Sequence, residues 1–211
     1  MNSMFETVDN LDALPDLISD SDGVITDFSS AFHSYMSDAL GLNAFVNEPS
    51  NFDYSDAYPS YDSPSKHINE FINNPKYFGS MRIYPEAKLA LKKLHSSGVK
   101  ITIVTSIGDS LEVQRSRLDL YNRELNNIVD DVIFLPLGGK KHGTLELFPC
   151  SFFVDDLVSE CESANAIGHS SFLFPRKYNA HMSSNIGVKQ LPFKWYSLPY
   201  FNHQPNLFGS K

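Results

Sequence analysis

Cysteine is scarce in this sequence, which contains only Cys150 and Cys161 among its 211 residues. Two cysteines are too few for the disulfide framework that small secreted domains use. A chain of this length buries about 70% of the surface that its unfolded form exposes, so it needs neither disulfides nor structural metals to fold. The scarcity of cysteine favours a reducing compartment, and we expect a cytoplasmic protein.

Long hydrophobic runs and a basic start are also missing. The first nineteen residues contain no Lys or Arg, whereas secretory signals and transit peptides carry a basic segment. No apolar run approaches the roughly 18 residues of a membrane helix, and the strongest candidate, ITIVTSIGD, is interrupted by polar side chains. We therefore expect a soluble protein that is neither exported nor anchored in a membrane.

Basic side chains are outnumbered by acidic ones. The 17 Lys and Arg residues face 25 Asp and Glu residues, which gives a formal net charge of −8. This balance opposes binding to a nucleic-acid backbone, whose phosphates need basic partners. A long nucleic acid is therefore a disfavoured partner, while a small anion could still bind in a locally positive pocket.

Short apolar runs recur along the chain and indicate the fold class. Most are apolar on both faces, as expected for parallel strands that helices cover on both sides. Strands are predicted at 17–19, 99–104, 131–135, 150–154 and 171–174. Strands that alternate with helices imply right-handed crossovers and a doubly wound parallel sheet of the α/β class. Ligands in this class bind beyond the carboxyl ends of the strands.

Helices with clear ends lie between these runs. The first begins at Pro85 and stops before Gly98, which suits the left-handed position after a helix. The second is capped by Asp109 or Ser110, and four of its apolar residues keep helical spacing: Leu111, Leu118, Tyr121 and Leu125. The third covers about 157–167 and stops before a glycine.

One segment, 29–81, interrupts this alternation. It contains two helical patterns, at 31–42 and 66–74, separated by a stretch rich in Pro, Ser and Asp. A disordered linker would have few aromatic residues, but this stretch has Phe45, Phe52, Tyr54, Tyr58 and Tyr61. We therefore predict an ordered, small and mainly helical cap domain at 29–81, inserted after the first strand into an α/β core formed by 1–28 and 82–211. The last twenty residues have no clear period, and we expect them to wrap the core or to fray.

Two of the predicted strands end in paired acidic residues. Asp20 and Asp22 follow the first strand, and Gly23 permits the sharp turn that lets both face one pocket. Such a pair suits a nucleophile beside a general acid and base, or a cation site. Asp155 and Asp156 close the fourth strand, where ionised carboxylates repel each other unless a positive group lies between them. Taken singly, a surface turn or a helix cap explains either pair.

Two other strands end in residues that could contact phosphate. Thr105 and Ser106 close the second strand, although a helix cap also explains them. Lys140 and Lys141 follow a Gly-Gly pair after the third strand, and a solvated loop explains at least one of them. The Walker pattern GxxxxGK[ST] is not met, which excludes that nucleoside triphosphate site. Four strand ends thus deliver paired Asp, hydroxyl, Lys and paired Asp, and together they indicate a phosphoryl-transfer site.

This ordered set resembles the four motifs of the haloacid dehalogenase (HAD) superfamily of phosphohydrolases, over about residues 17–174. More narrowly, the sequence is similar to the 5′(3′)-deoxyribonucleotidase family in DSDGVITDF, YPEA, IVTS, FFVDD, FLFPRKYNAH and WYSL. It departs from that family in the Ile-Gly pair after IVTS, where the family often has Pro, and in a longer stretch between the lysine loop and VDD. The resemblance implies a HAD-like Rossmannoid core with a cap, and Mg²⁺-dependent hydrolysis of a phosphate monoester, most specifically a (deoxy)nucleoside monophosphate.

The resemblance also implies a role for each motif residue. Asp20 would be the nucleophile that forms an aspartyl-phosphate, and Asp22 the acid and then the base. Thr105 would bind the phosphate, and Lys141, in preference to Lys140, would neutralise its oxygens.

The remaining implied roles concern binding. Ser106 and Lys140 would contact the substrate, and Phe28 falls where the family packs an aromatic ring against the nucleobase. The Mg²⁺ ligands would be the Asp20 carboxylate, the backbone carbonyl of Asp22 and one of Asp155 or Asp156, with Asp156 preferred.

Three alternatives stay open. The protein could be a HAD phosphatase of sugar or other small metabolite phosphates, a choice that depends on the cap. It could be a catalytically silent HAD-like binding protein, although all motif residues are present. Action on nucleic-acid ends is disfavoured by the acidic balance. A homodimer is compatible with the sequence, which does not specify the oligomeric state.

Overall fold

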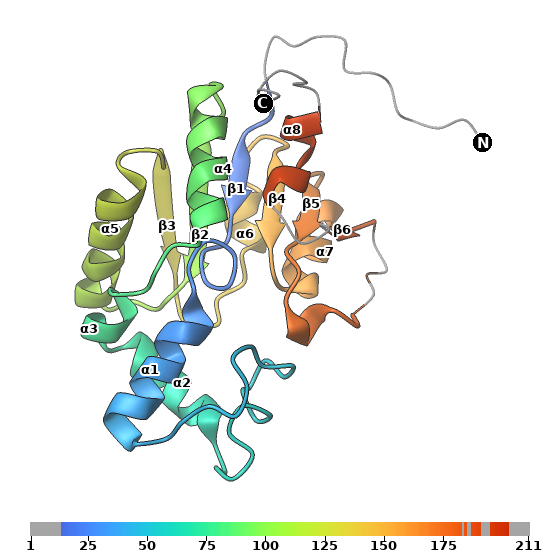
Figure 1. Cartoon of the computed structure of the whole chain (residues 1–211). Coiled ribbons are helices and arrows are strands. Elements are labelled where there is room, and N and C mark those ends of the chain that lie inside the picture. Colours follow the sequence, from blue (N-terminus) through green and yellow to red (C-terminus); the bar gives the residue numbers. More distant parts are fainter. Residues whose placement is uncertain (1–13, 183, 185–186, 191–194, 203–211) are drawn as a thin grey trace, which may run out of the picture.

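A six-stranded parallel sheet forms the centre of the molecule (Figure 1). The structure is a computed structural model that describes residues 14–182, 184, 187–190 and 195–202. The strand order is β3-β2-β1-β4-β5-β6, and all neighbours are parallel. The strands are β1 (Leu17–Ser19), β2 (Ile101–Ser106), β3 (Asp131–Leu135), β4 (Phe152–Asp155), β5 (Ser170–Leu173) and β6 (Lys189–Gln190). The predicted doubly wound α/β fold is confirmed.

The order of the strands reverses beside β1. The chain passes from β1 to β2 and β3 on one side, and then crosses to β4 on the other side of β1. Ser19 pairs in register with Ile103 of β2 and with Val154 of β4. The residues that follow β1 therefore emerge between two other strand ends, at the switch point where open α/β sheets bind ligands.

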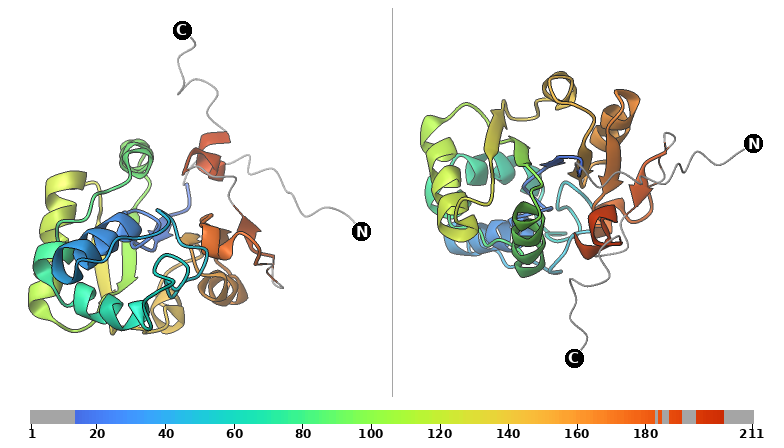
Figure 2. Two further views of the ribbon diagram at one scale, coloured as in Figure 1. Left: turned by 60° about the horizontal axis from the view of Figure 1, so that its bottom comes forward. Right: turned by 90° about the horizontal axis from the view of Figure 1, so that it is seen from above.

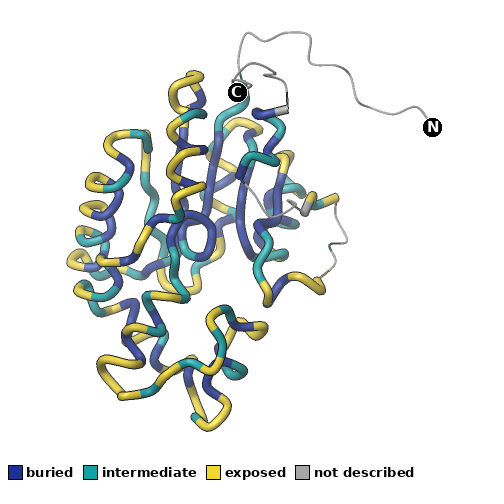
Figure 3. The backbone as a smooth tube through the Cα atoms, in the orientation of Figure 1, coloured by how far each residue is buried: buried dark blue, intermediate teal, exposed yellow. Residues whose placement is uncertain are grey.

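Helices cover both faces of the sheet, as the view from above shows (Figure 2). Alternate residues of each strand point to opposite faces, so that Leu17 packs toward α4 (Pro85–Ser96) and Ile18 toward α7 (Val158–Ala166). The first layer also contains α5 (Leu111–Leu125), the 3-10 turn η2 (Trp195–Ser197) and α8 (Pro199–Asn202), and the second contains α6 (His142–Leu145). Strands β1 and β2 are almost wholly buried between these layers, and β4 and β5 are buried apart from their first residues, whereas the edge strand β3 is only half-buried (Figure 3).

The element boundaries follow the sequence closely, with three differences. The strands β1 and β3 and the start of α4 have the predicted bounds, and Ser110 is the cap of α5. The first difference is β6, which is too short and too polar to give an apolar run. In the second, three strands are shifted from their predicted bounds: β2 begins and ends two residues later, β4 begins two residues later and ends at Asp155, and β5 begins and ends one residue earlier. In the third, Leu111 and Leu118 are exposed, because α5 turns a face with Tyr121 and Leu125 toward the core.

The regular elements of the predicted cap segment, 29–81, are all helices, and a long loop (41–63) separates the first of them from the second. The segment holds most of α1 (Phe28–Leu40) and all of α2 (Pro64–Ile72) and α3 (Pro75–Phe78), which lie below the sheet in Figure 1. Tyr54 and Tyr58 are buried in a hydrophobic cluster of this segment, whereas Phe45 and Phe52 are exposed. Because residues of α5 complete the same cluster, the division into two domains stays a prediction.

The described part of the C-terminal region packs on the core. Trp195 is fully buried and its indole N–H donates to the Val24 carbonyl at 3.3 Å, while the Tyr200 hydroxyl donates to the Pro15 carbonyl at 2.6 Å. The expectation of wrapping therefore holds for 195–202. Residues 192–194 and 203–211 lie outside the described residues. The same holds for residues 1–13, which make up most of the segment on which the prediction about targeting signals was based. Within the described chain, no helix combines the length and the apolar character needed to cross a bilayer.

Candidate active site

A cavity of about 590 Å³ lies between the carboxyl edge of the sheet and the cap segment. Its lining comes from strand ends on one side and from α1, α2 and the cap loop on the other. All nine site residues that the sequence predicts line this one cavity: Asp20, Asp22, Phe28, Thr105, Ser106, Lys140, Lys141, Asp155 and Asp156. The sheet topology brings them together from positions up to 136 residues apart (156 minus 20). Their roles stay predictions.

The turn after β1 sets the position of the first acidic pair. The Ser21 carbonyl accepts hydrogen bonds from the backbone N–H groups of Ile25 at 2.7 Å and Thr26 at 2.9 Å, which close the loop tightly. Gly23 has φ +82°, and a Cβ added there would lie 2.4 Å from Oδ2 of Asp156. Glycine is thus required both for the backbone conformation and for the close approach of the second acidic pair.

Lys141 joins the two acidic pairs. Its Nζ lies 2.5 Å from Oδ1 of Asp20 and 2.6 Å from Oδ2 of Asp155, and the residue is only 4% exposed. Lys140, by contrast, has a side chain that is 73% exposed and that pairs with Glu160 at 3.2 Å. Lys141, and not Lys140, is therefore the lysine that contacts the acidic pairs.

Glu160, which the sequence analysis did not single out, holds this lysine loop. Its carboxylate is buried, accepts the backbone N–H of Lys141 at 3.1 Å through Oε2, and pairs with Lys140 through Oε1. Its place on α7, four residues after the second acidic pair, is the only local signal that could have indicated it. Ser106 supports the same loop, because its hydroxyl donates to the Gly139 carbonyl at 2.8 Å.

The acidic cluster carries unusual electrostatics. One carboxylate oxygen from each of Asp20, Asp155 and Asp156 lies within 4.8 Å of the others, and all three residues are buried. Burial, and then the neighbouring carboxylates, raise the pKa of Asp20 well above its ordinary value, although Lys141 opposes this shift. Burial and Asp155 raise the pKa of Asp156 to about 7. For Lys141, burial alone would lower the pKa, but Asp155 and Asp20 outweigh it and raise the pKa overall.

This cluster has the ligand chemistry of a hard divalent cation. Carboxylate oxygens are the donors that Mg²⁺ prefers, and one lysine does not balance three buried carboxylates. Asp155 is already engaged, since its Oδ2 pairs with Lys141 and its Oδ1 accepts the Leu157 backbone N–H at 2.8 Å. Asp156 lies against Gly23 and accepts a hydrogen bond from the Tyr178 hydroxyl. The residues therefore fit a Mg²⁺ site built on Asp20 and Asp156.

The other acidic residue of the first pair has different partners. Oδ1 of Asp22 accepts a hydrogen bond from the Thr26 hydroxyl at 2.7 Å and lies 2.9 Å from Nη2 of Arg117. Arg117 is completely buried in α5, and no motif in the sequence pointed to it. A lone Arg on a predicted amphipathic helix usually faces solvent, so only the three-dimensional packing identifies this contact.

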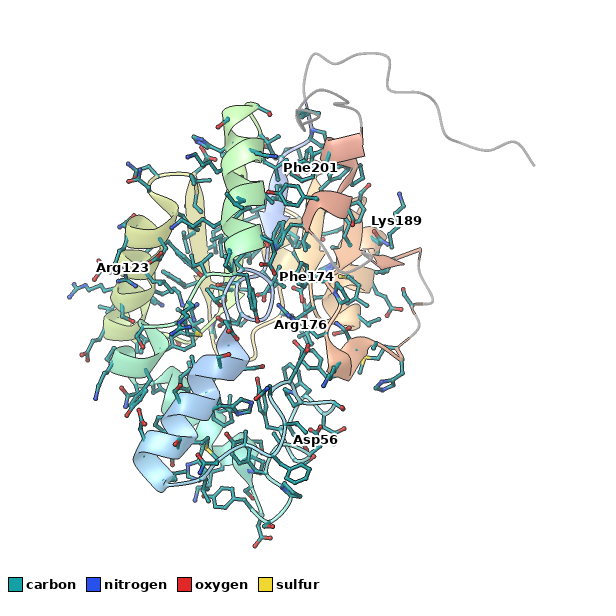
Figure 4. The ribbon with its side chains drawn as sticks, viewed as in Figure 1. Asp56, Arg123, Phe174, Arg176, Lys189 and Phe201 are labelled. Atoms are coloured by element: carbon teal, nitrogen blue, oxygen red, sulfur yellow. The ribbon has the colours of Figure 1, made fainter. Side chains whose placement is uncertain are left out.

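Aromatic residues form the cap side of the cavity. The Phe28 ring packs edge-on against Phe71 at 5.2 Å between centroids and lies beside Tyr54 at 6.3 Å. Arg176, which is labelled in Figure 4, also lines the cavity, and its guanidinium lies 4.6 Å from the Tyr84 ring centre. The cavity thus has charged groups at the sheet and rings at the cap. Sequence reasoning assigned no role to Arg176, although it lies in the segment FLFPRKYNAH.

Solved structures share this architecture, although no protein-family model and no curated protein sequence matches the chain. A D,D-heptose 1,7-bisphosphate phosphatase from B. bronchiseptica, complexed with magnesium and phosphate, is 14% identical with a TM-score of 0.55, over 86% of this chain and 94% of its own. A HAD-superfamily hydrolase from Geobacter sulfurreducens is 17% identical with a TM-score of 0.55, over 92% of this chain and 99% of its own. An L-2-haloacid dehalogenase from Xanthobacter autotrophicus is 14% identical with a TM-score of 0.51, over 81% of this chain and 79% of its own.

These structures establish that the chain has the HAD fold. They are named as a phosphatase, a hydrolase and a dehalogenase, and one fold supports different reactions. The reaction therefore depends on the residues of the site.

Proposed function

We propose that this protein is a Mg²⁺-dependent phosphate monoester hydrolase that acts on nucleoside monophosphates through an aspartyl-phosphate. The observation that carries the proposal is the bridge that Lys141 makes between Asp20 and Asp155, beside the carboxylate of Asp156. A nucleophile, a fixed cation and a cation site within one cavity are what phosphoryl transfer requires.

The proposed reaction has two steps. A carboxylate oxygen of Asp20 attacks the phosphorus atom, the bond from phosphorus to the ester oxygen breaks, and Asp22 donates a proton to the departing oxygen. Asp22 then accepts a proton from a water molecule that attacks the same phosphorus, which releases phosphate and restores the Asp20 carboxylate. Both residues act as the resemblance implies, and both line the same cavity.

Charge is the main obstacle to the first step, because the phosphate and the Asp20 carboxylate are both negative. Lys141 offsets this repulsion, since its Nζ lies 2.5 Å from the attacking group in a buried setting where charge is poorly screened. The Thr105 side chain, 1% exposed at the end of β2, offers a hydroxyl to a phosphate oxygen. When bound to Asp20 and Asp156, Mg²⁺ would supply further positive charge to the phosphate oxygens.

The cap side of the cavity supports a nucleotide as the substrate. Phe28 and Tyr54 on this side, and Tyr84 of the core at the start of α4, offer rings that can stack on a base. Asn47 and Asn69 of the cap offer amides that can hydrogen-bond its edge. A cavity of about 590 Å³ also has the usual size of a small-molecule site.

A substrate panel tests this proposal. Nucleoside monophosphates, hexose phosphates and 2-chloropropionate would be assayed for release of phosphate or chloride, with Mg²⁺ and with excess EDTA. We expect the nucleotides to be hydrolysed fastest, only with Mg²⁺, and not by Asp20→Asn. Asp119→Asn, an exposed change on α5, should match the wild type. Hydrolysis that EDTA leaves unchanged, or chloride release without phosphatase activity, would contradict the proposal.

A further inference from the structure

A completely buried arginine lies beneath the turn that carries the first acidic pair. Arg117 sits in the middle of α5, between the apolar residues that attach this helix to the core and to the cap. Arg117 is not one of the described residues that line the cavity. Burying a guanidinium is costly unless it is paired, so the contacts of Arg117 should show what it stabilises.

All the polar contacts of Arg117 in the described chain lie on the turn after β1. Nη1 donates to the Ser21 hydroxyl oxygen at 3.4 Å and to the Thr26 hydroxyl oxygen at 3.3 Å, and Nη2 lies 2.9 Å from Oδ1 of Asp22. The Phe78 ring of the cap segment covers the guanidinium, 3.9 Å away. Neither Nε nor Nη2 makes a directed hydrogen bond there, so the contact with Asp22 is an ion pair.

These contacts fix the orientation of the Asp22 carboxylate. An arginine can only donate, so Thr26 accepts from Arg117 and is free to turn its own hydrogen toward Asp22, whose Oδ1 is 2.7 Å away. Both described side-chain contacts of Asp22 are therefore made by Oδ1. The side chain is 20% exposed and lines the cavity, so that Oδ2 is available to a bound substrate.

We infer that Arg117 is a positioning residue that holds Asp22 with Oδ2 toward the substrate, so that proton transfer to the leaving oxygen can occur. This inference rests on the proposed function, in which Asp22 is the acid and base. Arg117 never touches the substrate, and its effect passes through Asp22 and Thr26. It should therefore matter for the steps that move a proton and matter little for phosphate binding.

The choice of leaving group distinguishes the phosphoryl transfer to Asp20, which needs a proton from Asp22 only for some substrates, from the hydrolysis of the aspartyl-phosphate. Transfer of the phosphoryl group from p-nitrophenyl phosphate to Asp20 releases p-nitrophenolate, which leaves without a proton, whereas a nucleoside or alkyl alkoxide must receive one from Asp22. Hydrolysis of the aspartyl-phosphate needs Asp22 as a base in both cases. A misplaced Asp22 should therefore slow the first step only for the alkyl substrates, and the second step for all substrates.

The experiment compares Arg117→Met and Arg117→Lys with Arg123→Met, a change on the same helix at a side chain that is 56% exposed. For Arg117→Met we expect kcat on an alkyl phosphate to fall by about 100-fold or more, which is the contribution of a positioned general acid. The pre-steady-state burst of p-nitrophenolate should keep its rate within about threefold, and slow turnover should follow it. Arg117→Lys should recover part of the loss, and Arg123→Met should behave like the wild type.

Each outcome bears on the inference. Equal losses of burst amplitude and of kcat for both substrates would show a merely structural role and overturn it. If the Arg117 variants fail to fold, Thr26→Val removes the hydroxyl that Arg117 and Asp22 share, and it should give the same dependence on the leaving group; equal losses there would overturn the inference too. If the wild-type protein hydrolyses no monoester, the proposed function and this inference both fail. If the wild type is active but the variants lose alkyl phosphate and p-nitrophenyl phosphate activity in the same ratio as the wild type shows, the inference alone fails.

Discussion

Replacing Lys141 by Met should lower the free energy of unfolding by about 3–5 kcal/mol at pH 8 in EDTA, the usual cost of removing one partner from a buried ion pair. Lys141 is 4% exposed, and its Nζ lies within 2.6 Å of two carboxylates. Met preserves the apolar stem, so the loss comes from the charge. Without the ammonium group, Asp20 and Asp155 would stay buried with no cation between them.

The loss should depend on pH. The raised pKa values of Asp20 and Asp156 mean that the folded state binds more protons than the unfolded state, so stability falls as the pH rises from about 4 toward 7. Because Lys141 lowers the pKa of both groups, its removal should strengthen this trend. The defect should be largest near pH 8 and clearly smaller at pH 5, where protonated carboxyl groups need no cation.

Urea denaturation of the wild type and the variant at pH 5 and pH 8, both in EDTA, measures the effect. Lys88→Met is the control, because the side chains of its ion pair with Glu124 are 45% and 36% exposed and this pair should contribute no more than about 1 kcal/mol. A loss below about 1 kcal/mol for Lys141→Met at pH 8, or a defect that is equal at both pH values, would show that Lys141 does not offset the charge of the buried carboxylates.

Three further predictions follow from the same site. Gly23→Ala should lower the thermal midpoint more than Gly98→Ala does. Both positions have positive φ (+82° and +83°), but only the new Cβ at position 23 would clash, 2.4 Å from Asp156. Equal losses would contradict the close contact. Mg²⁺ should stabilise the wild type by about 2.7 kcal/mol at 100 times its Kd, and it should stabilise Asp156→Asn much less. Thermal melts with and without Mg²⁺ measure this, and an equal increase of the thermal midpoint in both proteins would show that Asp156 is not a ligand. Phe28→Ala should raise KM for a nucleotide by about 5- to 150-fold, the equivalent of 1–3 kcal/mol of base stacking, while p-nitrophenyl phosphate hydrolysis stays nearly unchanged; a parallel loss on both would argue against stacking.

The strand ends of this protein could be predicted because their signals are local. Asp20 and Asp155 each end or directly follow a short apolar run, and such runs indicate strands buried on both faces. Parallel strands place their carboxyl ends at one edge of the sheet, so the spacing along the chain was enough to gather the acidic pairs, Thr105 and a lysine around one cavity.

The contacts that depend on packing could not be predicted. Lys140 and Lys141 are equivalent in the sequence, and only the fold decides which one reaches the carboxylates. Arg117 meets Asp22 from 95 positions away (117 minus 22), and neither helical spacing nor charge marks it as buried. Leu118 shows the converse error, because its helical spacing suggests a core position but the orientation of α5 exposes it.

The proposed function requires that Asp20 becomes phosphorylated during turnover. Acid quenching of the enzyme during steady-state hydrolysis, reduction with borohydride and mass spectrometry of the peptides measure this directly, since an acyl phosphate is reduced to the alcohol. We expect homoserine at position 20 in the wild type, only when both substrate and Mg²⁺ are present. Phosphate release with no homoserine there, or with homoserine at another aspartate, would contradict it.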